Sequence, residues 1–238
     1  MALTDRKLMT FDVVGTLIDF ETGILDYIHA KAGQKGLKLS DQAILEAYAV
    51  AEDRQHHETP RLPFPSMMAP MYREMAAKLG LPDTVGDVEG FRLSIPRWPA
   101  FPDSVSALKR LRKRFRLVAM TNSDNWALSN FAKTLDMPFD DMVTAEMVGW
   151  NKPDPQVFAF TRGRQSMEGY GFDDILHVAQ SQYHDIAVAK RLGYNTCWIE
   201  RRKGKSGAGA TPRTAEVVIP DYHFASLAEL ADAVDAGL

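Results

Sequence analysis

Residues 8–18 read Leu8-Met9-Thr10-Phe11-Asp12-Val13-Val14-Gly15-Thr16-Leu17-Ile18, and this stretch decides the fold. The apolar run is too short for an independent helix and stops at Gly15-Thr16, which predicts a buried strand that ends in a tight turn. Asp12 stands where this strand runs out. A carboxylate in an apolar strand is costly to bury unless it is paired, hydrogen-bonded or used in chemistry. Asp12 is therefore either a reactive group or a buried cap of the next turn, and the short pattern alone favours neither.

The composition is that of an ordinary soluble globular protein, with 45% hydrophobic and 25% charged residues in a chain of 238. The net charge of -3 gives no indication of a nucleic-acid partner. One basic run, Arg201-Arg202-Lys203-Gly204-Lys205, precedes a segment rich in Gly and Ala. We interpret this run as a solvated, mobile loop rather than as a phosphate-binding patch.

The single cysteine, Cys197, excludes an intrachain disulfide and fits a reducing cytoplasm. Its apolar surroundings in residues 195–199 predict a core residue rather than a thiol nucleophile. The chain reaches Asp12 too soon to hold the apolar part of a signal peptide, and it has no apolar run long enough to span a bilayer. We therefore expect a cytoplasmic protein without a membrane partner.

Hydrophobic periodicity predicts mostly helix up to Trp98, followed by alternating strands and helices. Such alternation is typical of βαβ units, so the predicted fold class is α/β, with a parallel sheet and helices on both faces. We expect a core of residues 1–17 and 98–238 and an inserted helical cap of residues 18–97. Expected helices cover residues 22–33, 40–54 with Ser40 as N-cap, 71–79 with Pro70 in the first turn, 127–135, 186–192 and 227–234, and two more helices run through Leu108 and Leu111 and begin after Pro153. Expected strands cover 8–12, 117–120, 142–145, 175–179, 196–199 and 217–219.

Four short segments fall at expected strand ends or helix starts, where ligands of such sheets bind. They are Asp12-Val13-Val14-Gly15-Thr16, Thr121-Asn122, Lys152-Pro153-Asp154-Pro155 and Gln180-Ser181-Gln182-Tyr183-His184-Asp185. In this order they resemble the four motifs of the haloacid dehalogenase superfamily of hydrolases, which have a Rossmann-like core. The resemblance covers nearly the whole chain. It implies a nucleophilic aspartate, a hydroxyl and an amide from the second motif, a positioning lysine and an acidic fourth motif, which fall on Asp12, Thr16, Thr121, Asn122, Lys152 and Asp185.

A nucleophilic carboxylate forms a covalent ester and splits one difficult step into two. It must be ionised, and we expect Lys152 with hydroxyl and backbone donors to hold the pKa of Asp12 down. Phosphatase relatives carry a second Asp two residues after the nucleophile, where this chain has Val14. That acid protonates a departing alcohol, a contribution of roughly 100- to 10,000-fold in rate, whereas a halide leaves without a proton. Val14 therefore favours carbon–halogen cleavage.

The fourth motif points to the type II (L-2-haloacid) dehalogenases, which need no metal. Phosphatase relatives usually place a Mg²⁺-binding Asp where this chain has Gln180, with a second Asp four residues later, whereas Asp185 follows by five. In the dehalogenases this motif resembles Ser-Ser-Asn-x-x-Asp, so Gln180 and Gln182 are departures from their pattern. A tyrosine expected six residues after Lys152 is Phe158.

The candidate substrate-binding residues are Val14, Thr121, Asn122, Gln180, Gln182 and Arg54. Arg54 is the candidate to receive the halide, and its alternative is a solvated helix arginine among other polar residues. Three histidines, at 56, 57 and 184, are either site residues or surface.

We therefore expect a hydrolase that releases halide from a small 2-haloacid, without a cofactor; the resemblance also implies a homodimer as one oligomeric state. A first alternative is a phosphatase or phosphonate hydrolase of the same fold, with Mg²⁺ held by Asp12 and Asp185. A second is a non-catalytic binding protein in which Gln180 and Gln182 have disabled the site.

Overall fold

A computed structural model describes residues 2–205, 209–211 and 217–238. Six strands form one parallel sheet in the order β3-β2-β1-β4-β5-β6, which confirms the predicted α/β class. The strand that precedes Asp12 lies centrally in this sheet. The strands are β1 (Leu8–Phe11), β2 (Arg116–Thr121), β3 (Asp141–Thr144), β4 (Ile175–Ala179), β5 (Asn195–Ile199) and β6 (Tyr222–Phe224).

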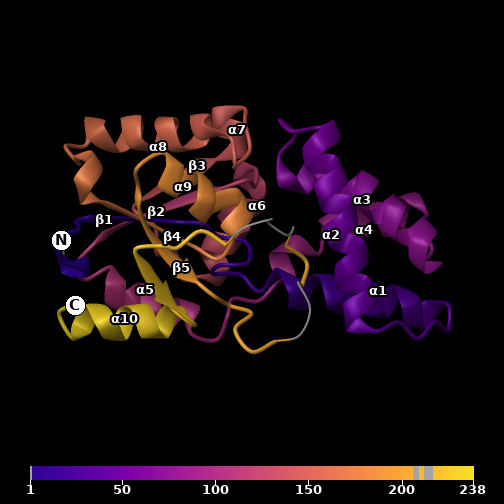
Figure 1. The fold of residues 1–238 in the computed structure, drawn as a ribbon. Helices are drawn as coiled ribbons and strands as arrows, with labels where there is room; N and C mark the ends of the chain where they lie inside the picture. Colours follow the sequence, from indigo (N-terminus) through magenta and orange to yellow (C-terminus); the bar gives the residue numbers. More distant parts are fainter. Residues whose placement is uncertain (1, 206–208, 212–216) are drawn as a thin grey trace.

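Helices cover both faces of the sheet, with α5 and α10 on one face and α8 and α9 on the other (Figure 1). Side chains alternate along each strand, so Met9 and Leu8 belong to different core clusters. The cluster of Met9 includes Leu108 of α5 and Leu230 of α10, whereas the cluster of Leu8 includes Phe158 of α8. The helices around the sheet are α5 (Ser104–Leu111), α6 (Asn125–Thr134), α7 (Ala145–Val148), α8 (Pro155–Met167), α9 (Ala187–Arg191) and α10 (Leu227–Asp235).

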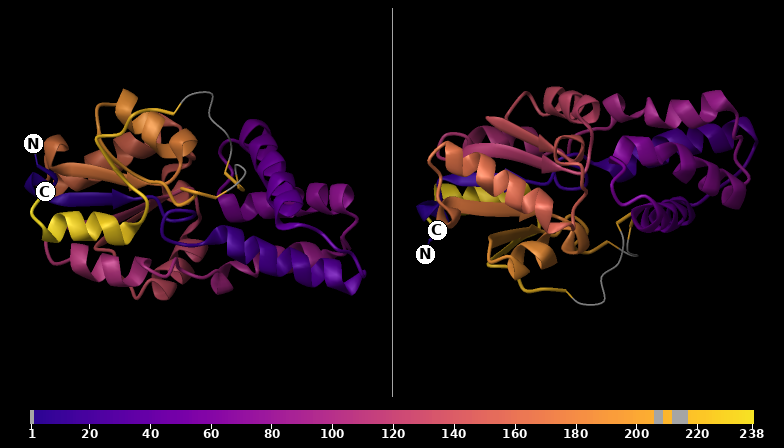
Figure 2. Two further views of the ribbon diagram at one scale, coloured as in Figure 1. Left: turned by 60° about the horizontal axis from the view of Figure 1, so that its bottom comes forward. Right: turned by 90° about the horizontal axis from the view of Figure 1, so that it is seen from above.

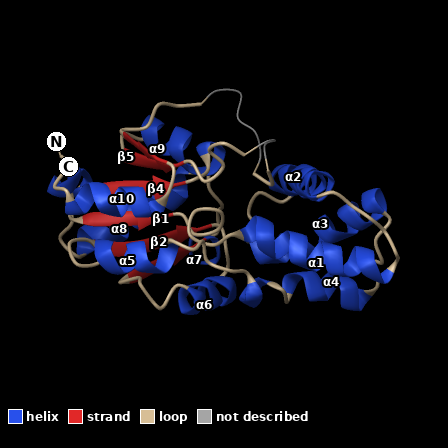
Figure 3. Cartoon of the chain, turned by 90° about the horizontal axis from the view of Figure 1, so that it is seen from below, coloured by secondary structure: helices blue, strands red, loops and turns tan. Residues whose placement is uncertain are grey.

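A second group of helices lies beyond the carboxyl ends of the strands (Figures 2 and 3). It consists of α1 (Phe20–Gln34), α2 (Asp41–Glu58), α3 (Phe64–Leu79) and α4 (Val85–Arg92), and we call it the helical layer. As predicted, Ser40 caps α2 by accepting a hydrogen bond from the Ala43 N–H. The methionines of α3 (Met67, Met68, Met71 and Met75) are buried in the core. In the described part of the chain no helix is long and apolar enough to cross a membrane.

The chain passes between the sheet and the helical layer in two short segments, which lie side by side. Ile18 forms an isolated antiparallel bridge with Ala100, and the Asp19 N–H donates to the Pro99 carbonyl at 2.8 Å. Trp98 is buried next to these segments, with its ring packed against Phe64 of α3 and Phe131 of α6. The division into a core and a cap at residues 18 and 97 stays a prediction.

Two predicted elements are wrong. Residues 217–219 form no strand; Val217 and Ile219 are 64% and 84% exposed, and the edge strand is β6 instead. The β-branched composition of this run suits a strand, but no neighbouring strand pairs with it. Helix α3 begins at Phe64 with Pro65 in its first turn, where a missing N–H costs nothing, and Pro70 lies inside the helix.

The interpretation of the basic run as a solvated loop is also wrong at its start. The Arg201 side chain is only 7% exposed and pairs with Asp103 at 2.8 Å, while its Nε donates to the Thr16 carbonyl at 2.9 Å. Arg202 pairs with Glu21 of α1. These two arginines thus tie the segment after β5 to the turn that follows Asp12 and to the helical layer. Residues 206–208 of the expected loop lie outside the described part of the chain.

Substituting Gly23 of α1 tests the packing between the helical layer and the sheet. A Cβ atom at this position would lie 2.2 Å from Cδ1 of Trp98, so Gly23→Ala requires the buried indole to move. We expect the free energy of unfolding to fall by about 1–3 kcal/mol in urea denaturation. Gly33→Ala in the same helix is the matched control, because nothing lies within 4 Å of its Cβ position. It should raise stability by up to about 1 kcal/mol; equal losses in both variants would contradict the proposed steric clash.

Candidate active site

Asp12 follows β1 directly and is fixed by the turn behind it. Its N–H donates to the Val178 carbonyl of β4 at 3.1 Å, and its Oδ2 accepts a hydrogen bond from the Thr16 hydroxyl at 2.6 Å. The Thr16 oxygen in turn accepts from the Gln180 N–H at 2.8 Å. Gly15 provides the turn with a φ of +88°, a conformation that side chains with a Cβ disfavour. The turn therefore holds this carboxylate at the carboxyl end of the sheet.

Lys152 lies between the two motif carboxylates. Its side chain is 0% exposed, and Nζ donates to Asp12 Oδ1 at 2.9 Å, to Asp185 Oδ1 at 2.7 Å and to the Met120 carbonyl at 2.9 Å. An ammonium has three N–H donors, so all of them are used. The one cation is thereby shared by two buried anions.

Asn122 clamps the backbone of Lys152. Its Oδ1 accepts from the Lys152 N–H at 2.6 Å, and its Nδ2 donates to the Lys152 carbonyl at 2.9 Å. These two bonds hold the backbone of the lysine in place. Asn122 also lines the cavity and its Nδ2 has a second N–H, so its role in substrate binding stays a prediction.

Asp185 lies in the single π-helical turn Gln182–Ile186, where a regular helix was expected to begin at residue 186. Its Oδ1 accepts from Lys152 and also contacts Nε2 of His177 at 2.9 Å. Its Oδ2 has no hydrogen-bond partner among the described residues. Sequence reasoning missed His177, although a histidine inside the otherwise apolar run of β4 was a signal of a polar contact in the core.

The pKa values of the two carboxylates shift in opposite directions. Burial would raise the pKa of Asp185, but Lys152 and the hydrogen bond from His177 outweigh it and lower that pKa to about 2. Burial and the neighbouring Asp185 raise the pKa of Asp12, and they outweigh the opposite effects of Lys152 and Thr16. The expectation that these donors hold the pKa of Asp12 down is therefore wrong, because burial, the largest effect, and the nearby Asp185 outweigh them.

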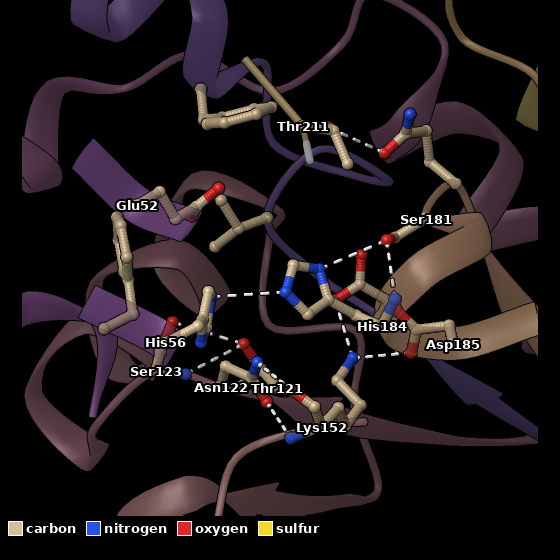
Figure 4. Close-up of a pocket in the computed structure, with 15 residues that line it drawn as sticks. Glu52, His56, Thr121, Asn122, Ser123, Lys152, Ser181, His184, Asp185 and Thr211 are labelled. Carbon is tan, nitrogen blue, oxygen red and sulfur yellow. Dashed lines mark hydrogen bonds and ion pairs between the residues drawn. The ribbon is translucent and has the colours of Figure 1, made fainter. Parts of the chain in front are cut away.

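A cavity opens above these groups, between the sheet and the helical layer (Figure 4). It brings together most of the predicted site residues, while Thr16 supports Asp12 from behind. The Thr121 hydroxyl lies 3.2 Å from that of Ser123, a lining residue that sequence reasoning did not include. The lining residues are Asp12, Val14, Phe20, Glu52, His56, Phe64, Thr121, Asn122, Ser123, Lys152, Gln180, Ser181, His184, Asp185 and Thr211.

Arg54 and Gln182 lie away from this cavity, contrary to expectation. The Arg54 side chain is 57% exposed and its guanidinium pairs with Glu74 at 3.5 Å. Helix α2 presents Glu52 and His56 to the cavity instead, because residues four apart share a helix face and the residue midway between them points elsewhere. Gln182 bonds through both ends of its amide to the backbone of Val218, at 3.0 and 3.3 Å.

Two of the three candidate histidines belong to the site. His56 and His184 line the cavity with their Nε2 atoms 3.2 Å apart, whereas His57 is exposed. Burial lowers the pKa of His56 to about 4 and that of His184 below its usual value, and it raises the pKa of Glu52 to about 8. All three side chains are therefore uncharged at neutral pH. In a neutral pair at this distance, one of the two facing nitrogens carries a hydrogen and donates it to the other in a hydrogen bond.

The donor set does not fit a Mg²⁺ ion well. No group of three or more His, Cys, Asp or Glu side chains arranged to hold a metal occurs among the described residues. Asp12 and Asp185 each direct one oxygen to the lysine, and Gln180 occupies the position where phosphatase relatives have a carboxylate. Mg²⁺ prefers octahedral oxygen ligands that include one or two carboxylates, so two acids tied to one ammonium are a poor cage.

Comparisons with known proteins agree with the four motifs. A family model described as haloacid dehalogenase-like hydrolase matches residues 6–193. The (S)-2-haloacid dehalogenase of Pseudomonas fluorescens is 27% identical over 107 residues, which span 44% of this chain and 45% of that protein. The mouse haloacid dehalogenase-like hydrolase domain-containing protein 3 is 25% identical over 96% of this chain and 94% of its own length.

A solved structure extends the likeness to the fold. The L-2-haloacid dehalogenase of Xanthobacter autotrophicus with chloropropionic acid covalently bound has a TM-score of 0.78 over 98% of this chain and 100% of that chain. At 16% sequence identity this likeness shows the fold alone. Together these matches confirm the predicted family resemblance and the predicted fold.

The raised pKa of Glu52 predicts how stability depends on pH. As pH rises from the usual value of 4.5 to about 8, the unfolded state loses this proton while the folded state keeps it, so stability falls. Glu52→Gln removes this loss, and its stability relative to wild type should increase across this window by about 1.4 kcal/mol per unit at most. Urea unfolding at several pH values measures the difference. Glu46→Gln, on the exposed side of the same helix, is the control; parallel curves for wild type and Glu52→Gln would contradict the prediction.

Proposed function

This chain belongs to the haloacid dehalogenase-like hydrolases, and we propose that it cleaves the carbon–halogen bond of a small 2-haloacid with Asp12 as the nucleophile. One observation carries the proposal: the Asp12 carboxylate, held by Lys152 at 2.9 Å, lines the same cavity as Val14. No acid stands two residues after Asp12 to protonate an alcohol. A halide needs no such acid, because it leaves as a stable anion.

In the first step a carboxylate oxygen of Asp12 attacks the halogen-bearing carbon. The carbon–oxygen bond forms as the carbon–halogen bond breaks with inversion, and the halide leaves with the bonding electron pair. Lys152 and Thr16 hold the carboxylate in a fixed orientation for this attack, at 2.9 and 2.6 Å. The product of the step is an ester between Asp12 and the substrate.

In the second step water attacks the carboxyl carbon of Asp12 and the 2-hydroxyacid leaves. Asp185 accepts the proton of the water, because its Oδ2 is free of hydrogen bonds from the described residues. Lys152 stabilises the oxyanion that develops on Asp12, since its Nζ already lies 2.9 Å from Oδ1. Asp185 passes this proton to the alcohol oxygen of the departing 2-hydroxyacid, and the second proton of the water leaves to solvent, so both carboxylates are ionised again.

Hydroxyl and backbone donors receive the substrate carboxylate in this proposal. Thr121 and Ser123 line the cavity close to Asp12 and supply two hydroxyl groups. Glu52, His56 and His184 complete the wall as neutral polar groups, so they add no negative charge against an anionic substrate at neutral pH. The helical layer acts as a cap that limits the access of bulk water to the ester.

Asp12→Asn tests the nucleophile. Wild-type protein incubated with 2-chloropropionate and a chelator should release chloride, and the variant should lose roughly 1,000-fold or more of this rate because an amide cannot form the ester. In a single turnover in ¹⁸O-water with excess enzyme, the label should enter Asp12 and not the hydroxyacid. Thermal unfolding and circular dichroism establish that the variant is folded.

Other outcomes identify the alternatives. Phosphate release from phosphate esters that needs Mg²⁺ and stops in chelator selects the phosphatase or phosphonate hydrolase. Tight binding of a small molecule in a thermal-shift assay, with no turnover that depends on Asp12, selects the non-catalytic binding protein. Either result overturns the dehalogenase proposal.

The raised pKa of Asp12 predicts the pH dependence of the first step. Only the ionised carboxylate attacks, and because burial raises its pKa above the usual 3.8, the rate of ester formation should fall at a higher pH than for an ordinary aspartate. The initial burst of halide, measured between about pH 4 and 8, reports this step. A burst rate that stays constant down to pH 4 would contradict the prediction.

A further inference from the structure

We propose that His177 is a positioning residue for the hydrolytic step, and that with Thr10 it fixes Asp185 so that one buried carboxylate oxygen, which has no hydrogen-bond partner among the described residues, is held ready to accept a proton from the attacking water. The inference rests on the proposed function and extends it to two strand residues that do not line the cavity. His177 lies in the middle of β4 and is fully buried.

A short chain of hydrogen bonds connects these residues. Thr10 of β1 and His177 of β4 are partners in the parallel sheet register, and the Thr10 hydroxyl lies 2.9 Å from Nδ1. On the other side of the ring, Nε2 lies 2.9 Å from Oδ1 of Asp185. All three side chains are buried, so water does not compete for these bonds.

The chain also fixes where the hydrogens are. Asp185 is ionised, so Nε2 must carry the hydrogen that it donates to the carboxylate. A neutral imidazole then has a lone pair on Nδ1, which accepts from the Thr10 hydroxyl. Asp185, which can only accept, thereby selects the tautomer, and the Thr10 hydroxyl holds the ring from its other side.

The two oxygens of Asp185 consequently differ. Oδ1 accepts from both Lys152 and His177, at 2.7 and 2.9 Å, whereas Oδ2 has no partner in the described part of the chain. Two donors on one oxygen oppose rotation of the carboxylate. The free oxygen is therefore held in one orientation as a proton acceptor, which is the preorganisation that a water-activating group requires.

Packing alone would not select a histidine here. On this face of the sheet His177 contacts the ring of Phe158 edge to face, with ring centroids 5.4 Å apart, in an otherwise apolar cluster. An imidazole in such surroundings is costly unless its nitrogens are hydrogen-bonded. Phe158 has no hydroxyl, so in the described structure His177 and Lys152 are the side chains that donate to Asp185.

Paired variants separate this role from a structural one. His177→Leu removes the donor to Asp185, while His177→Gln keeps an amide N–H near the position of Nε2. Rapid quenching measures the halide burst, which reports ester formation, and mass spectrometry measures the ester on Asp12. We expect His177→Leu to slow hydrolysis of the ester roughly 10- to 100-fold, as loss of an orienting partner typically does. A halide burst equal to the enzyme concentration and accumulation of the ester should accompany this, and His177→Gln should recover most of the rate.

Thr10 provides a second pair that keeps the ring in place. Thr10→Val removes the hydroxyl and should slow the same step by a smaller factor, whereas Thr10→Ser should not. This pair decides the question if His177→Leu fails to fold.

The inference is overturned if wild type turns over and the donor-free variants hydrolyse the ester at its rate, or if they slow ester formation and hydrolysis equally. A wild-type protein that forms no ester and releases no halide overturns the proposed function instead, and this inference with it.

Discussion

The shared ammonium of Lys152 is the interaction on which the site depends. It joins the ends of β1 and β2 and the turn after β4, through Asp12, the Met120 carbonyl and Asp185. Two buried carboxylates that close would repel each other and would be costly to keep ionised without a cation. Asn122 of the second motif in turn holds the backbone of Lys152 of the third motif. The second motif therefore helps to fix the position of the lysine. Three loops that are distant in sequence therefore form one rigid charged floor.

The wall of the cavity carries no charge. Glu52 and His56 come from the helical layer and His184 from the turn after β4, and all three are neutral beside a floor whose cation is already paired twice. Asn151 fastens this wall to the floor by donating to the carbonyls of Pro60 and Leu62, at 2.9 and 2.7 Å. The electrostatic character of the cavity thus comes from the sheet, and its shape comes from the helices above it.

Much of the fold could be read from local patterns. Apolar runs that end in polar residues located five of the six strands, because parallel strands buried on both faces have continuous apolar sequences. The sixth was misplaced to residues 217–219, since an edge strand has a weak pattern and Tyr222–Phe224 resembles a loop. Pro70 was expected in a first turn because prolines are usually excluded from helix interiors. The packing of α3 in the folded protein accommodates Pro70 inside the helix, and a local sequence pattern does not show this packing.

The sequence by itself determined the fold class, the family and the motif residues Asp12, Thr16, Lys152 and Asp185, because each motif is a local pattern at a strand end. Only the tertiary structure decided that Arg54 points away, that Glu52, His56 and His184 form the wall, and that His177 holds Asp185. Which face of a helix meets the cavity depends on packing between distant segments. Protonation likewise depends on the tertiary structure: the pKa of Asp12 is raised first by burial and then by the neighbouring Asp185, and no single motif records either effect.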